Sequence, residues 1–541
     1  MTFAQKYQRP VTITRKPGRA ASQPRLQDVE QVNQPSSQVL SFVSPTGGLM
    51  RNIDVANIPE GGAARLENWY PQSDVVRPRG GSVERNSGMQ IEVLSLMVYE
   101  TGVSRKLFAA TSTSIFEATT PGAVGAAVVT GIVASVWSNI NFTTSGGVFL
   151  VACATGNDRR LYNGATWGTI PAITGVAANL LSQVSSYSNR LFFVESGTAN
   201  AWYLTPDAVG GAATKFPLGG EFKSGGALLA TGTWSSDAGD SPRSMWVAVS
   251  VEGDVVVYEG ADPATWSKRG NYKIPRPLGI NCMFPTGGDL AIMTEAGLFA
   301  MSQIVSLDTA ALSRESVSKN IRTLWREIAN GQSSTVERWQ MVRIDAAGFA
   351  IVMPVKSGQG ASQQLVANME TGAWAVWKGW LPTCGADFGG KLVFGTVNGR
   401  MMEGDAGGSD DGIPYSCVYI GRSQMIEGRT INARFARAIG RSVALDPPKV
   451  ASIFDYSLDA PPAPSASIRG SGSLWQPAVF STKWDRAKWA SEAATRQQWQ
   501  AVTGRGWAVA PCVIYTFAQT TAPSTQLIRT DLMVDVGEMM T

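Results

Sequence analysis

Short apolar runs alternate with Gly, Asn and Asp turns from about residue 41 onward, which is the pattern of β-hairpins. Seven hairpins look like copies of one unit: an apolar strand, a polar or glycine turn and a second strand. They begin at Lys106, Val148, Arg190, Trp246, Asp289, Ala350 and Lys391. Four of the six intervals between these starts are 41 to 43 residues, within the ~40 to 45 residues of a WD40-type propeller blade. The pattern predicts an all-β protein in which residues 41–420 form a β-propeller-like domain of about seven blades.

One segment has helical spacing instead. Apolar residues recur there at i, i+4, i+7, i+8 and i+11, namely Val317, Ile321, Leu324, Trp325 and Ile328. Asn330 and Gly331 follow and supply a stop signal. We therefore predict one amphipathic helix that caps or braces the sheets.

The two ends of the chain differ from this repeat. Residues 1–40 hold six basic side chains against Asp28 and Glu30, with many Gln, Ser and Pro and almost no apolar periodicity. They predict a flexible basic N-terminal arm that orders against a neighbour, or a merely disordered tail. Residues 421–541 contain strand-like runs at 431–445, 507–517 and 527–536. They predict a C-terminal β region, although the chain could also return there to complete the first sheet system.

The most apolar stretch, residues 122–137, has 16 residues and is rich in Gly and Val. It is shorter than the ~20 residues that a membrane-spanning helix needs, so we expect buried strands and no stable membrane insertion. Residues 1–10 lack the apolar core of a signal peptide, so secretion by that route is not expected.

Composition narrows the chemistry further. The chain has 46 basic and 42 acidic residues and no histidine, which removes Ser-His and Cys-His nucleophile pairs and His-bearing metal sites. Its five cysteines are far apart and form no CxxC pair, so we interpret them as buried thiols in a protein assembled in a reducing cytosol. Neither a Walker A loop nor a strand-GxGxxG-helix unit is present. We expect no enzyme activity and no cofactor.

Two acidic turns allow other readings. Residues 235–241 match the front of the Asp box of sialidase-type propellers, with Pro242 in the place of the aromatic anchor. Sialidases work without histidine, through a Tyr nucleophile and a carboxylate acid, so a glycan-binding or sialidase-like propeller is the alternative function. Asp405, Asp410 and Asp411 lie among glycines and are weak candidates for Ca²⁺ ligands; an ordinary solvated turn is the other reading.

A locally basic stretch surrounds Arg434, Arg437 and Arg441. If it lined the lumen of a ring of subunits, these arginines would meet DNA phosphates without reading bases. Salt bridges between subunits are the alternative role. The odd separation of Arg434 and Arg437 would place them on opposite faces of a regular strand.

Three segments resemble a known family, the tail nozzle (tail tubular protein B) of short-tailed bacteriophages. The first is residues 57–82, NIPEGGAARLENWYPQSDVVRPRGGS, where an Asn-Trp-Tyr-Pro element leads into a basic Gly-rich turn. The second is residues 370–412, with its TGAW, GGKLVFGT and GGSDDG runs, and residues 484–513 are similar in kind.

This resemblance implies a structural virion protein. A tail nozzle subunit assembles as a homo-hexamer that docks below the head-tail adaptor ring of the portal. It supports tail fibres or spikes and lets double-stranded DNA pass during genome ejection. We therefore expect a virion tail location, with assembly in the host cytoplasm.

Overall fold

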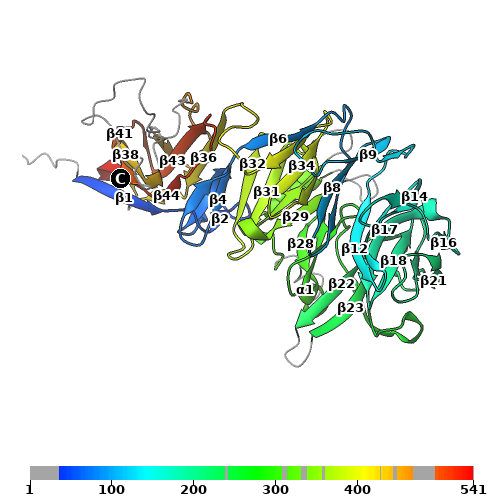
Figure 1. Cartoon of the computed structure of the whole chain (residues 1–541). Helices are drawn as coiled ribbons and strands as arrows, with labels where there is room; N and C mark the ends of the chain where they lie inside the picture. Colours follow the sequence, from blue (N-terminus) through cyan, green and yellow to red (C-terminus); the bar gives the residue numbers. More distant parts are fainter. Residues whose placement is uncertain are drawn as a thin grey trace, which may run out of the picture.

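The computed structural model describes residues 36–237, 242–307, 312, 315–330, 338–355, 360–426, 428–442, 448–466 and 494–539. Figure 1 shows an elongated molecule, with a ring of sheets at one end and the strands β1, β38 and β44 at the other. None of the helices in the described ranges has the length and apolar character needed to cross a membrane.

The first four blades of the ring are four-stranded antiparallel sheets that follow one another along the chain. Blade one holds β7 (Ser95–Glu100), β8 (Arg105–Ala110), β9 (Ser114–Glu117) and β11 (Val129–Thr130). Blade two holds β12 (Ser138–Thr144), β13 (Gly147–Ala154), β14 (Asn157–Tyr162) and β15 (Trp167–Gly168). Blade three holds β17 (Leu181–Tyr187), β18 (Arg190–Glu195), β19 (Asn200–Tyr203) and β21 (Thr214–Pro217). Blade four holds β22 (Leu228–Asp237), β23 (Pro242–Ser250), β24 (Asp254–Glu259) and β25 (Ser267–Lys273).

Three further blades complete the ring. Blade five holds β26 (Met283–Pro285), β27 (Leu290–Thr294) and β28 (Gly297–Ala300). Blade six holds β29 (Gln340–Ile344), β30 (Phe349–Met353), β31 (Gln363–Asn368) and β32 (Trp374–Lys378). Blade seven holds β33 (Pro382–Asp387), β34 (Leu392–Thr396) and β35 (Met401–Gly404), and its fourth strand is β6 (Ser82–Ser87) from the N-terminal side.

The protein is thus a seven-bladed β-propeller, as the hairpin pattern predicted. Each predicted hairpin provides the second and third strands of one blade, from β8 and β9 in blade one to β34 and β35 in blade seven. In six of the seven blades, two to four residues join these two strands, so their alternation is a clear signal in the sequence. Hydrogen bonds between β6 and β35 close the ring, because the chain itself does not run from blade seven to blade one.

The predicted helix is α3 (Arg322–Ala329), preceded by the 3-10 turn η4 (Lys319–Ile321). Trp325 is fully buried, and its Nε1 donates to the Thr294 carbonyl of β27 at 2.8 Å. The helix therefore braces blade five, as expected. A second short helix, α1 (Met301–Ser306), directly follows β28. With six residues it is too short to show a helical period of apolar residues in the sequence.

Beyond the propeller lies a second β unit built from both ends of the chain. One of its sheets contains β1 (Ser36–Val43), β4 (Trp69–Pro71), β5 (Val76–Pro78), β38 (Arg429–Ser442), β40 (Ala494–Gln497), β41 (Gln500–Ala501), β42 (Arg505–Gly506) and β44 (Gln526–Met539). The other contains β2 (Gly48–Leu49), β3 (Gly62–Glu67), β36 (Tyr415–Gly421), β37 (Gln424–Met425), β39 (Lys449–Phe454) and β43 (Ala508–Phe517). It joins blade six where Glu67 of β3 pairs with Val376 of β32.

This pairing places residues 36–78 with the C-terminal strands, whereas the sequence pattern grouped residues 41–420 together. Residues 36–43 join the C-terminal strands because β1 and β44 pair along their length. Leu40 pairs with Leu532, and both side chains are buried. Residues 36–40 of the predicted arm are therefore strand, and residues 1–35 lie outside the described residues.

The apolar stretch 122–137 was expected to be buried, and this expectation is wrong. It contributes only β10 (Gly122–Ala123) and the two residues of β11 to sheets before crossing to blade two. Val129, Ile132 and Trp137 are buried, but Val128 and Val133 are 42% and 58% exposed. A segment that follows the outer edge of a blade has one side against the sheet and the other in solvent.

The remaining short elements lie in the connections. They are β16 (Ile173–Thr174), β20 (Gly211–Ala212), η1 (Val55–Asn57), η2 (Ala178–Leu180), η3 (Pro263–Thr265) and η5 (Asp345–Ala347). All five cysteines are buried and free of disulfides, as the interpretation as buried thiols expected. Burial raises the pKa of the Cys282 thiol to about 12, which keeps it protonated and unreactive.

Candidate functional site

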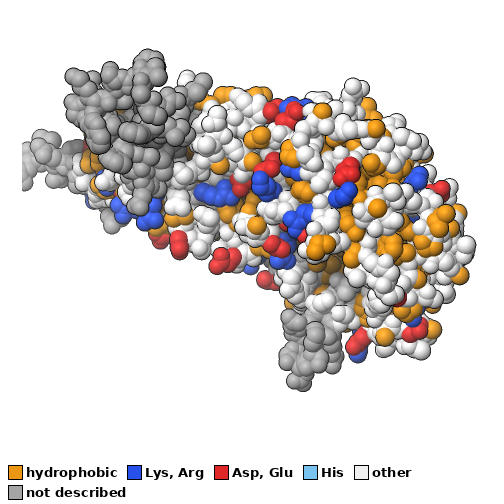
Figure 2. Space-filling model, in the orientation of Figure 1, with side chains coloured by type: hydrophobic (Ala, Val, Ile, Leu, Met, Phe, Trp, Pro, Cys, Tyr) orange, Lys and Arg blue, Asp and Glu red, His pale blue; other side chains and the backbone are white. Residues whose placement is uncertain are grey.

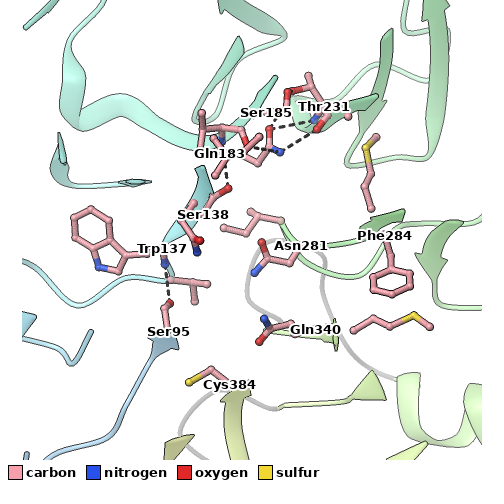
Figure 3. A pocket seen from close by; sticks show the side chains of 18 of the residues that line it. Ser95, Trp137, Ser138, Gln183, Ser185, Thr231, Asn281, Phe284, Gln340 and Cys384 are labelled. Carbon is pink, nitrogen blue, oxygen red and sulfur yellow. Dashed lines mark hydrogen bonds between the residues drawn. The ribbon is translucent and has the colours of Figure 1, made fainter. Parts of the chain in front are cut away.

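The innermost strands of the seven blades surround a central channel. Its cavity of about 490 Å³ receives side chains from every blade. Figure 3 shows this wall from close by. One lining residue from each blade, in order, is Ser95, Ser138, Gln183, Thr231, Phe284, Gln340 and Cys384.

Most polar groups of the channel wall bind the neighbouring blade. The Ser95 hydroxyl accepts a hydrogen bond from the Trp137 amide at 2.8 Å, and the Ser138 hydroxyl accepts one from the Val184 amide at 3.2 Å. The corresponding bonds elsewhere run from Gln183 Nε2 to Thr231 O, from Gln340 Nε2 to Gly385 O, and from Thr383 Oγ1 to Val93 O. These bonds fix the shape of the channel, because a buried polar group that loses its partner is costly.

Two side chains of the wall keep unused hydrogen-bonding capacity. Figure 3 shows the Asn281 amide pointing into the space between Ser138 and Gln340, and it has no hydrogen-bond partner among the described residues. Arg338 is 10% exposed; its Nη2 donates to Glu92 Oε1 at 2.7 Å, while its Nη1 is buried without a partner.

Arg338 is the one charged side chain among the described residues that line the channel, and those residues include no Asp, Glu or Tyr. The described lining therefore lacks the Tyr, carboxylate and arginine cluster of sialidase chemistry. In the predicted Asp-box segment, the backbone of Asp237 ends β22 opposite Pro242 of β23, and residues 238–241 lie outside the described residues.

A second site, which we call the closing clasp, forms where the N-terminal segment meets blade seven. Arg79 is fully buried and donates to both carboxylate oxygens of Asp410, at 2.8 and 2.6 Å. Its guanidinium lies between the rings of Trp380 and Tyr415, 4.6 and 4.1 Å from their centroids. The remaining N–H groups donate to Asn68 Oδ1 and to two backbone carbonyls, so this buried charge is fully hydrogen-bonded.

A second ion pair and a close backbone contact complete the clasp. Arg77 forms a bidentate ion pair with Asp405, at 2.8 and 3.1 Å. The Gly81 amide donates to the Gly407 carbonyl at 2.9 Å. A Cβ on Gly81 would overlap the Ser409 carbonyl, so only glycine allows this close approach of two chain segments.

The three aspartates considered as Ca²⁺ ligands bind arginines instead. Asp405 binds Arg77, Asp410 binds Arg79, and Asp411 accepts from Arg400 at 2.7 Å. No group of three carboxylate or thiol side chains suited to a metal ion occurs in the part of the chain that the structure describes.

The three arginines considered for DNA contact lie on β38, on one face of its sheet. Arg434 donates to Asp535 at 2.6 Å and Arg437 to Asp531 at 2.9 Å. These aspartates are four residues apart on β44, so they point to the same side. A β-bulge at Arg434 shifts the alternation of β38 by one residue, which corrects the expectation of opposite faces.

Arg441 has the same alternation as Arg437 and is exposed. The Arg437 guanidinium lies 4.5 Å from the ring centroid of Trp499. We call this solvent-facing side, with Arg434, Arg437 and Arg441, the arginine face. Two of its three arginines are neutralised within the chain.

Sequence reasoning missed Arg79, Arg338 and Asn281. Nothing in the local sequence marks them, because each acquires its role from residues that are distant in the chain. The basic Gly-rich turn that contains Arg79 was noticed only as part of the family resemblance.

No protein-family model and no curated protein sequence matches this chain. Among solved structures, it is similar to the crystal structure of BBS1N in complex with ARL6DN, at 10% identity and a TM-score of 0.38, over 60% of this chain and 97% of that one. It is also similar to the computationally designed Ika8 protein, at 11% identity and a TM-score of 0.33, over 60% of this chain and 99% of that one. Both scores are low, so the propeller description rests on the sheets themselves.

Proposed function

We propose that this protein is a structural subunit of a bacteriophage tail, one of several copies in a nozzle ring that continues the DNA channel below the adaptor. The observation that carries the proposal is a surface of the propeller formed by two segments that contain no charged residue and expose apolar side chains. The family resemblance in the sequence indicates which kind of assembly would cover it.

This surface, the apolar rim, consists of residues 119–137 and 169–180. Neither segment contains a charged residue. Both lie beside Gly156. Val133 is 3.9 Å from the position of a Cβ on this glycine. The Gly156 amide donates to the Asn179 carbonyl at 2.8 Å. Val133 is 58% and Leu180 42% exposed, and Figure 2 shows hydrophobic side chains gathering over the end of the propeller that carries β12, β14 and β17.

An exposed apolar patch of this kind is typical of a protein interface. The cores of interfaces are also depleted of charged residues. A ring of copies would bury the apolar rim against neighbouring subunits. The resemblance implies six copies, a contact with the adaptor ring and the support of fibres or spikes.

The clasp supports the same reading. It joins two of the segments that resemble the tail nozzle family, residues 57–82 and 370–412, through Arg79 and Asp410. In this fold, Arg79 and Asp410 hold the two segments together. The propeller channel, at about 490 Å³, has the size of a small-molecule site, so DNA would pass through a lumen between copies.

The proposal is tested by the oligomeric state of the purified protein, measured by mass photometry and electron microscopy. We expect rings for the natural protein and monomers for the double variant Val133→Asp/Leu180→Asp, because buried carboxylates without partners oppose association. Val103→Asp is the matched control, since Val103 is 99% exposed and lies outside the apolar rim.

Two results would contradict the proposal. A natural protein that stays monomeric and is absent from purified particles would exclude a nozzle ring. Rings that persist in the double variant would exclude the apolar rim as the subunit contact.

A further inference from the structure

We infer that the propeller channel binds one small, uncharged molecule rich in hydroxyl groups, of the size of a monosaccharide. The channel volume of about 490 Å³ falls within the ~300 to 1,000 Å³ of small-molecule sites. The inference concerns the interior of a single subunit and does not depend on ring formation.

The charges of the wall select an uncharged ligand. Among the described lining residues only Arg338 is charged, and Glu92 neutralises it through the 2.7 Å bond. A cation would meet no free carboxylate there, and an anion would meet a guanidinium that is already paired. The unpaired Nη1 of Arg338 is shielded from solvent, so the hydrogen-bonding groups that a ligand would meet are uncharged.

The other wall side chains without a hydrogen-bond partner are amides, which can hydrogen-bond to the hydroxyls of a ligand. An amide presents donors and an acceptor together, and a hydroxyl is both donor and acceptor. Asn281 precedes β26 of blade five, and Asn139 lies on β12 of blade two, nearly opposite in a ring of seven blades. Neither amide has a hydrogen-bond partner among the described residues.

The site is formed before a ligand arrives. The bonds between blades, such as those of Ser95 and Ser138, hold the wall side chains in place. Binding a ligand therefore costs little conformational entropy of the protein, which favours binding even of a small polar molecule. Its hydroxyls would bind Asn281 and Asn139 without displacing the bonds between blades.

The test is a titration of the full-length protein with glucose, galactose and mannose, followed by saturation-transfer NMR and calorimetry. Glucuronate and glucosamine serve as the charged counterparts. Methyl glycosides form a further arm, which tells a sugar unit at the end of a chain from a free sugar. We expect at least one neutral sugar to bind and its charged counterparts to bind more weakly.

The variant Asn281→Leu removes the amide at nearly constant size. We expect it to weaken binding about tenfold, the effect of one lost hydrogen bond in a buried site. Asn57→Leu is the matched control, because Asn57 is exposed in η1, far from the channel; it should bind as the natural protein does. The melting temperature of both variants verifies that the propeller is intact.

Three results would overturn the inference. They are the absence of binding by every neutral sugar, tighter binding of glucuronate than of glucose, and unchanged affinity in Asn281→Leu. None of them would affect the ring proposal, which is judged by oligomeric state.

Discussion

The propeller and the second β unit both consist of antiparallel sheets, but the chain assembles them in different ways. Within most blades, the strands follow one another along the chain; β6 of blade seven, which comes from the N-terminal side, is an exception. In the second β unit, β1 pairs with β44 from the other end of the chain, and Ser41 Oγ donates to Asp531 across 490 residues. Short-range pairs form at a small entropic cost, whereas long-range pairs require most of the chain to be in place.

The closing clasp lies between these two regions and connects them. Arg79 and Asp410 are 331 residues apart, yet they share one buried ion pair. The clasp also holds β6 next to β35, so it closes the propeller and anchors the second β unit at once. The comparison therefore predicts that the largest destabilisation comes from the clasp, and smaller effects from either region alone.

The largest effect is expected for Arg79→Met. This change leaves Asp410 buried without its partner, and breaking a buried ion pair in this way costs about 3 to 5 kcal/mol. The measurement is the free energy of unfolding in urea. Arg400→Met is the control, since Arg400 is 37% exposed and its ion pairs should contribute less than about 1 kcal/mol. Equal effects of the two variants would refute the central role of the clasp.

Gly81→Ala tests the close approach of the two chain segments. Its Cβ would overlap the Ser409 carbonyl, and overpacking of this kind costs about 1 to 3 kcal/mol. Gly102→Ala is the control, because a Cβ there meets nothing within 4 Å. Thermal unfolding of the two variants provides the comparison, and a Gly81→Ala protein as stable as the control would contradict the packing argument.

Ser138→Ala breaks one bond between blades and leaves the clasp intact. The Val184 amide loses its acceptor, which costs about 1 to 3 kcal/mol in a buried position. We expect a value at the lower end, because water in the channel can replace the hydroxyl. Unfolding in urea measures it, and a loss as large as that of Arg79→Met would show that the ring depends on single blade contacts.

The triple variant Arg434→Gln, Arg437→Gln and Arg441→Gln tests the arginine face. Arg434→Gln should cost less than about 1 kcal/mol, because Arg434 is 60% exposed. Arg437→Gln should cost more, because it removes one of the two arginine partners of Asp531, which is buried. If this face lines the DNA path, ejection from assembled particles should slow or stall. Arg276→Gln, which breaks an exposed ion pair on the propeller, should leave ejection unchanged. Normal ejection by the triple variant would reject a DNA role.

The smallest effect concerns pH at the junction of β3 and β32. Burial raises the pKa of Glu67, but hydrogen bonds from Arg65 and Lys378 outweigh it and hold the pKa below its ordinary value of 4.5. A lowered folded-state pKa means that this stabilisation is present above pH 4.5 and is lost as the pH falls through the lowered value.

We therefore expect Glu67→Gln to be less stable than the natural protein at neutral pH and to lose less stability on acidification. Urea unfolding at a series of pH values measures this difference. Glu60→Gln, at an exposed position, is the control. Parallel pH profiles for Glu67→Gln and the natural protein would contradict the assignment.

Patterns along the chain predict the local structure of this protein. Alternation of apolar and polar residues located the hairpins of all seven blades. The run from residue 431 matches β38 as far as Ser442, and residues 443–445 lie outside the described residues. The helical spacing around Trp325 located α3. These signals are readable because period and turn chemistry act between residues a few positions apart.

How distant parts of the chain combine follows from the folded arrangement and not from local patterns. The burial of Arg79 depends on Asp410 and Trp380, and the common direction of Arg434 and Arg437 depends on a bulge against β44. The partial exposure of residues 122–137 likewise follows from their place at the edge of a blade. The charge, apolarity and spacing of side chains indicate which kinds of interaction they can form. The partner of each side chain depends on long-range strand pairing, which leaves no periodic signal in the sequence.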